Sequence, residues 1–86
     1  MANILDIKQR LSLRIRARRR EGKISQSELA ARSGVSLGSI KRFESSGEIS
    51  LTSLLRIAVV LGYETDFDRL FERINYQSID EIINAK

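Results

Sequence analysis

Two adjacent basic residues, Lys41 and Arg42, stand in a stretch of small, polar and apolar residues that follows Ser36. An arginine can donate two parallel hydrogen bonds to the edge of a guanine, and a lysine can pair with a phosphate. A short helix beginning after Ser36 would turn this stretch toward solvent, at a width that fits a major groove. The outward face that we predict for this helix consists of Leu37, Gly38, Ser39, Lys41 and Arg42.

Positive charge is concentrated in the first half of the chain. Residues 1–43 hold eleven lysines and arginines against three acids, whereas residues 44–86 hold four against eight. A basic half predicts a polyanionic partner, and nucleic acid is the foremost one in the cytoplasm. A basic solvated surface would have the same composition, so a motif has to decide between the two readings.

The composition argues against an enzyme or a metal protein. The chain has no histidine and no cysteine, the commonest general base and the commonest thiolate ligand. The acids Glu64, Asp66 and Asp68 have the wrong spacing for a calcium loop, and carboxylates at a helix start are favoured by the helix dipole. We therefore expect no catalysis, no cofactor and no metal.

No stretch of the 86 residues approaches the roughly 18 apolar residues of a membrane span. The opening segment MANILDIKQR lacks the apolar core of a signal peptide. The chain is therefore expected to be soluble and cytoplasmic, without membrane contact.

Helices joined by tight turns must position the basic residues, because proline is absent and strand-like alternation is scarce. Ser25 with Glu28 forms a capping box for one helix start, and Ser36 caps the next. Glycines end the helices, and Gly22 with Lys23 is expected to end the first, since glycine is the usual residue for a left-handed exit. The resulting all-α prediction has helices at 6–20, 26–33, 36–45 and 51–61, and a last short one that holds Phe67, Leu70 and Phe71.

The second and third of these helices form one unit, residues 26–45, with a sharp turn between them. Gly34 supplies the positive φ of that turn, and Ala30 is small where the second helix of the unit crosses. Apolar residues of the unit are expected to face inward and fix the crossing angle: Leu29, Val35, Ile40 and Phe43. On the later helix, the inward residues expected are Leu54, Ile57, Ala58 and Leu61.

This pattern resembles the Cro/repressor-type (Xre) family of helix-turn-helix regulators. The segments SQSELAARSGVS, SIKRFESSG and LLRIAVVLG carry the resemblance, which extends over roughly residues 8–72. It implies a five-helix, lambda-repressor-like domain over residues 1–72 that binds double-stranded DNA, followed by a C-terminal extension over residues 73–86.

The resemblance also implies roles for single residues. Gln26 corresponds to a residue that touches a phosphate or a base edge, and Arg19 and Glu44 correspond to a pair that forms a structural salt bridge. Leu37, Gly38, Ser39 and Arg42 correspond to base-facing sites. Other readings stay open: Arg42 as a solvated side chain, Lys41 as a phosphate contact or none, Leu37 as a packing residue. Gly38 has no side chain to read a base, which leaves much of the affinity to electrostatics.

A single unit of this kind reads only a half-site, so a homodimer is expected. A transcriptional repressor is the first functional hypothesis. An antitoxin that autoregulates through the same domain is the second, with the segment SIDEIINAK either joining a dimer or binding a toxin or other partner protein. A domain that has lost DNA binding is a third reading, and the basic half speaks against it.

Overall fold

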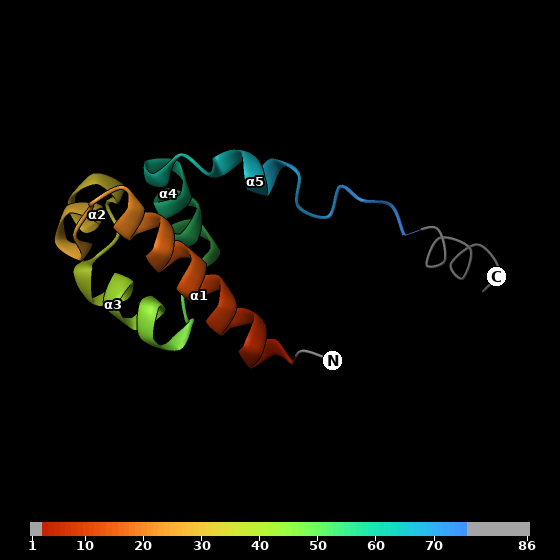
Figure 1. The fold of residues 1–86 in the computed structure, drawn as a ribbon, viewed down its shortest axis with the longest axis horizontal. Coiled ribbons are helices and arrows are strands. Elements are labelled where there is room, and N and C mark those ends of the chain that lie inside the picture. The colour runs from red at the N-terminus through yellow and green to blue at the C-terminus, as the bar shows by residue number, and fades with distance from the viewer. Residues whose placement is uncertain (1–2, 76–86) are drawn as a thin grey trace.

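The computed structural model describes residues 3–75 of the chain, and within them every regular element is a helix. In chain order the elements are α1 (Ile4–Glu21), α2 (Gln26–Ser33), α3 (Leu37–Ser46), α4 (Leu51–Leu61) and α5 (Glu64–Asp68). The long α1 lies across α3, while α2 and α4 close the domain on its other side (Figure 1). This confirms the all-α, five-helix prediction. Among these described residues, no helix is long and apolar enough to span a membrane.

Side-chain oxygens cap four of the helices at their starts. The hydroxyl of Ser25 accepts from the Glu28 backbone N–H at 3.0 Å, and that of Ser36 accepts from the Ser39 N–H at 3.1 Å. Ser50 and Asn3 cap α4 and α1 in the same way. The capping box at Ser25 is only half formed, because the carboxylate of Glu28 accepts from Arg32 one turn later instead of turning back.

The exit from α1 differs from the prediction. Gly22 has a right-handed conformation with φ −76°, and Lys23 takes the left-handed one with φ 57°. The chain turns at Lys23 because two backbone bonds close around it, from Lys23 N–H to Arg20 O and from Ile24 N–H to Arg19 O. Gly34, with φ 74°, does provide the left-handed turn between α2 and α3.

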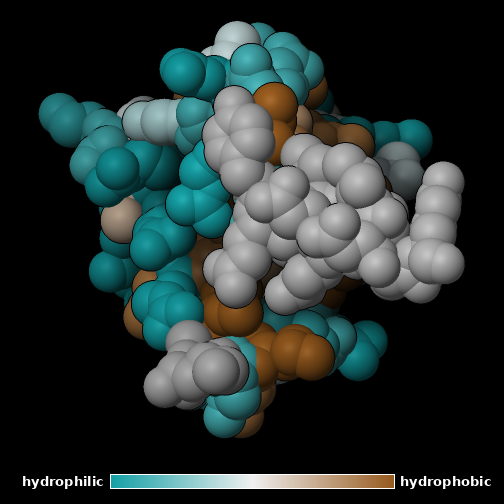
Figure 2. Space-filling view, turned by 90° about the vertical axis from the view of Figure 1, so that its right-hand side faces the viewer, coloured by the Kyte–Doolittle hydropathy of each residue, from teal (hydrophilic) through white to brown (hydrophobic). Residues whose placement is uncertain are grey.

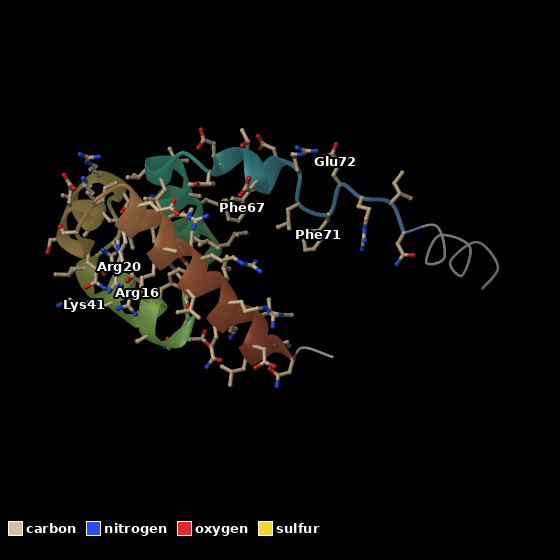
Figure 3. All side chains as sticks on the ribbon, viewed as in Figure 1. Arg16, Arg20, Lys41, Phe67, Phe71 and Glu72 are labelled. Carbon is tan, nitrogen blue, oxygen red and sulfur yellow. The ribbon has the colours of Figure 1, made fainter. Side chains whose placement is uncertain are left out.

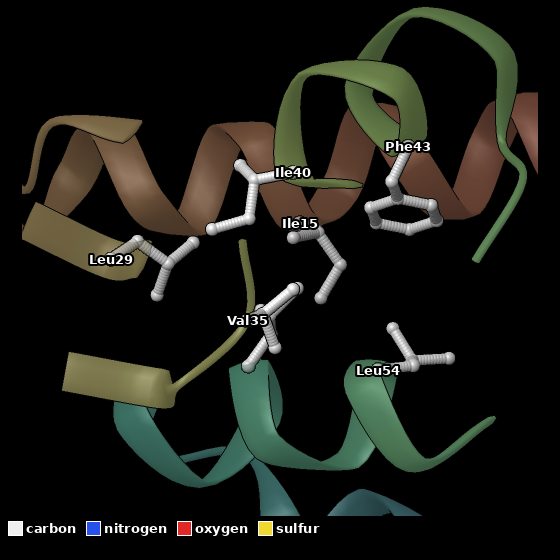
Figure 4. Close-up of a cluster of buried hydrophobic side chains, with 7 residues drawn as sticks. Ile15, Leu29, Val35, Ile40, Phe43 and Leu54 are labelled. Carbon is white, nitrogen blue, oxygen red and sulfur yellow. The ribbon is translucent and has the colours of Figure 1, made fainter. Parts of the chain in front are cut away.

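One apolar core joins the first four helices (Figure 4). The residues expected to face inward on α2, on α3 and in the turn between them are at most 4 % exposed. Burial of each such side chain contributes about 1.5–3 kcal/mol, which fixes the angle at which α3 crosses its neighbours. The buried apolar residues of the core are Ile15, Leu29, Val35, Ile40, Phe43, Leu54, Ile57 and Ala58.

The last helix is shorter than predicted. α5 ends at Asp68, so it holds Phe67, which packs against the core, but neither Leu70 nor Phe71. No side chain caps its start, and Phe71 itself has φ 62°, which a continuing helix could not accommodate. Residues 69–75 lead away from the domain (Figure 1), with Phe71 91 % exposed.

Apolar surface is exposed at the end of the molecule from which this segment leaves (Figure 2). Residues 76–86, which include the segment SIDEIINAK expected to join a dimer or bind a partner protein, lie outside the described residues.

Candidate nucleic-acid interface

The face of α3 turned away from the core is polar and basic. Gly38, Ser39, Lys41 and Arg42 are exposed, and Leu37 is half-buried. Ser36, also exposed, caps the helix and donates from its hydroxyl to Ser39 Oγ at 2.8 Å. The structure thus brings these residues together on one accessible surface of a short, well-anchored helix.

A buried carboxylate anchors α3 to α1. Both oxygens of Glu44 accept from Arg19, at 2.8 Å from Nε and 2.9 Å from Nη2, with side chains only 5 % and 9 % exposed. Arg19 Nη1 also donates to the backbone oxygen of Ile24 at 2.9 Å. This paired geometry suits the planar arginine fork and fixes the distance between the two helices.

The charges of this pair reinforce each other. Burial by itself raises the pKa of Glu44. Hydrogen bonds from Arg19 and Gln26 and the nearby positive charges lower the pKa by more than burial raises it, so it lies below its ordinary 4.5. The hydrogen bond to Glu44 raises the pKa of Arg19 despite its own desolvation. At neutral pH the pair is therefore fully ionised.

The structure ties Gln26 into the same network. Its Nε2 donates to Glu44 Oε1 at 3.2 Å, so the first residue of α2 is attached to α3. The family resemblance assigned Gln26 only an outward role toward phosphate or base. The inward contact escaped sequence reasoning because it depends on how α2 and α3 cross.

A polar hollow of about 290 Å³ borders one edge of the α3 face. Ser39 and Arg42 line it from α3, and Ser50 and Ser53 line it from the start of α4. Neither Ser50 nor Ser53 was predicted from the sequence to belong to the site. Their signal was the serine before the apolar run of α4, which places a hydroxyl and free backbone N–H groups at a helix start, a favourable environment for an anion.

Glu48 lies on the rim of the same hollow and carries the opposite charge. It accepts from Lys8 Nζ at 2.7 Å, and this bond is the main reason why the pKa of Glu48 lies below its ordinary value. The contact fastens the first turns of α1 to the segment after α3.

Among the residues that the structure describes, no group of histidines, cysteines and acids is arranged to hold a metal ion.

Two short helices joined by a sharp turn, with the second helix exposed and basic on a rigid core, define a helix-turn-helix DNA-binding domain. Residues 15–67 match the model of the helix-turn-helix family of Cro/C1 type, over more than half of the chain. The chain therefore belongs to this Xre family, whose members are DNA-binding transcription regulators. Comparisons with curated proteins and with solved structures gave no match.

Proposed function

We propose that the protein is a sequence-specific transcriptional repressor that inserts α3 into the major groove of double-stranded DNA. The observation that carries this proposal is the exposed face of α3, with Lys41 and Arg42 held outward by a helix whose other side is buried. A helix of this width fits the groove, about 12 Å across. As a bacterial-type regulator it acts in the cytoplasm, where the chromosome is accessible.

Within this interface we assign reading and positioning to different residues. Arg42 forks onto a guanine, while Ser39 and Leu37 contact neighbouring base edges. Lys41 and Gln26 hold phosphates, together with Ser36 and the backbone at the start of α3. Gly38 allows close approach, since its Cβ position has no neighbour within 4 Å.

We further propose that the protein binds its operator as a homodimer, because one α3 spans only a few base pairs. The apolar side chains after α5 support this: Leu70, Phe71 and Ile74 are each more than half exposed. Residues 73–86 would then form an extension, beyond a domain of residues 1–72, that contacts the second copy. Sedimentation of the full chain and of a chain ending at Ile74 tests this: a truncated chain that remains a dimer would contradict the role of the extension, and a monomeric full chain would contradict the homodimer.

The decisive experiment begins with selection of bound sites from a random DNA pool, followed by titration of variants against the selected site and its single-base changes. Arg42→Ala is expected to cost ~1–3 kcal/mol on the best site and to relax preference at one base pair. Lys41→Ala and Gln26→Ala are expected to weaken all sequences about equally. A chain that enriches no sequence would contradict the proposal.

If Arg42→Ala weakens every site by the same factor, Arg42 contacts a phosphate, and specificity lies with Ser39, Leu37 or DNA shape. If it changes nothing, α3 docks in another way and the site assignment is wrong. If the chain co-purifies with a second protein bound outside the DNA-binding surface, the antitoxin hypothesis would be supported instead.

A further inference from the structure

A cluster of basic side chains lies where α1 crosses α3, at the edge of the interface assigned above. It consists of Arg16 and Arg20 of α1 and Lys41 of α3 (Figure 3), and we refer to it as the crossing cluster. Arg16 and Arg20 are four residues apart, so they share one face of α1. Arg16 approaches Glu44 of α3, and Lys41 precedes Glu44 by three residues on the same helix, so the cluster is a single surface.

The positive charge of the crossing cluster is only partly neutralised within the domain. Both oxygens of Glu44 are already occupied by Arg19, and one of them also by Gln26. Arg16 comes no closer to that carboxylate than 3.9 Å, its Nε makes no hydrogen bond, and its side chain is 42 % exposed. Arg20 and Lys41 are exposed and have no ion pair with any residue in the described part of the chain.

The position of the cluster relative to α3 indicates what it binds. Lys41 lies on the edge of the exposed α3 face nearest to Glu44 and α1, since residues three apart on a helix are neighbours. The hollow of Ser39, Ser50 and Ser53 borders the opposite edge. A helix in the major groove has one phosphate backbone on each side, so the crossing cluster on one edge and the hydroxyl groups of the hollow on the other match the two strands.

We propose that Arg16, Arg20 and Lys41 bind phosphates of the DNA strand that borders the groove on the α1 side, opposite the strand that meets the hollow. This inference rests on the proposed function and adds Arg16 and Arg20 of α1 as contacts. Guanidinium groups bind phosphate oxygens through charge-assisted hydrogen bonds. Arg16 Nε is buried, but the Arg16 side chain is 42 % exposed and Arg20 is exposed, so the accessible parts of both side chains can reach a phosphate. The bound strand orients α3 but carries no sequence information.

The test compares two double variants with the same loss of charge. Arg16→Gln with Arg20→Gln removes the α1 part of the cluster. Arg10→Gln with Arg14→Gln removes two exposed arginines, also four residues apart, from a different face of α1, where Arg14 lines a groove toward α5. Urea denaturation of both variants verifies that each domain is folded.

Affinity is measured for a duplex of the selected site and for a random-sequence duplex, at several salt concentrations. Losing two phosphate contacts lowers the slope of log affinity against log salt by about 1.8 per half-site. Between ~50 and ~200 mM salt, the unaltered chain should therefore lose roughly tenfold more affinity per half-site than the Arg16/Arg20 variant. The ratio of specific to random affinity should stay unchanged, and Arg16→Lys with Arg20→Lys should restore most of the slope.

An equal effect of the Arg10/Arg14 control would show that only net charge matters, and would overturn the inference. An unchanged slope in the Arg16/Arg20 variant would also overturn the inference. The same holds if this variant keeps its DNA binding but loses binding to an acidic peptide. Failure of the unaltered chain to bind any duplex would instead overturn the proposed function itself. The two failures are therefore distinguishable.

Discussion

Replacing Glu44 by glutamine isolates the charge of the buried pair, because the two side chains have nearly the same shape. In the folded protein the amide offers Arg19 one acceptor oxygen in place of two, and no negative charge. Removing one partner of a buried ion pair costs 3–5 kcal/mol. We expect about 3 kcal/mol for Glu44→Gln, the lower end, because Arg19 keeps its bond to the Ile24 carbonyl.

The expected loss is large for a domain of this size, whose total stability is roughly 4–13 kcal/mol. It corresponds to a fall of about 12–24 °C in the midpoint of thermal unfolding. Urea unfolding followed by circular dichroism at 25 °C measures it directly. The matched control is Glu28→Gln, since Glu28 pairs with Arg32 at 3.1 Å on the surface, with side chains 43 % and 56 % exposed. Loss of that pair should cost about 0.3–0.5 kcal/mol.

The pH dependence of the loss gives a second test. The pKa of Glu44 is lower in the folded chain than its ordinary 4.5, so its charge stabilises the fold fully above that value. This stability is lost as the pH falls through the folded pKa. The difference between the unaltered chain and Glu44→Gln should thus be greatest near pH 7 and shrink below about pH 4.5. A difference under about 0.5 kcal/mol at pH 7, or one that persists undiminished into acid, would refute this account of the pair.

Three further perturbations probe the fold and the interface. Gly47→Ala should cost at least about 2 kcal/mol, because φ is 81° and a Cβ would lie 2.7 Å from Lys8 Cβ and 3.0 Å from the Lys8 carbonyl carbon. Gly62→Ala, with φ 83° but open space around the Cβ position, should cost only about 1 kcal/mol. Equal losses of stability in urea unfolding would contradict the contact with Lys8. Phe43→Ala, at a residue 1 % exposed, should cost about 3–5 kcal/mol, and a loss under about 1 kcal/mol would place Phe43 outside the core. For a dimer touching on the order of ten phosphates, affinity for the selected site should fall by several decades between ~50 and ~200 mM salt. Fluorescence anisotropy would measure this fall, and a salt-insensitive complex would exclude the proposed interface.

The helices and their core could be predicted because their signals are local. A serine directly before a helix is a preferred cap, because its hydroxyl accepts from the backbone N–H three residues later, and Ser25 and Ser36 do so here. Apolar residues at helical spacing must find a common core, which Leu29, Ile40 and Phe43 do. α5 could not be delimited in this way, because its end at Asp68 follows from a turn with no glycine or proline to mark it.

The interface was predictable only where it lies on a single helix. The face of α3 follows from residues 37–42 alone. The contact of Gln26 with Glu44, the hollow beside Ser50 and the crossing cluster each combine two or three helices. Their geometry depends on the angles at which those helices pack, and periodicity does not contain that information.

The carboxylate of Glu44 links the stability of the fold to the placement of the interface, and a last prediction separates the two. It joins α1 through Arg19 to α3 and, through Gln26, to the start of α2. Replacing a buried pair by apolar residues is often neutral or stabilising, so Arg19→Met with Glu44→Leu should unfold within about 1 kcal/mol of the unaltered chain. The double variant nevertheless removes the carboxylate that holds Gln26 and lies beside Arg16, so both side chains lose a contact that positions them for DNA. We therefore expect DNA affinity at 25 °C to fall several-fold while stability is retained, as parallel urea and DNA titrations would measure. Undiminished affinity in a stable double variant would show that packing alone positions α3, and that the buried pair has no part in DNA recognition.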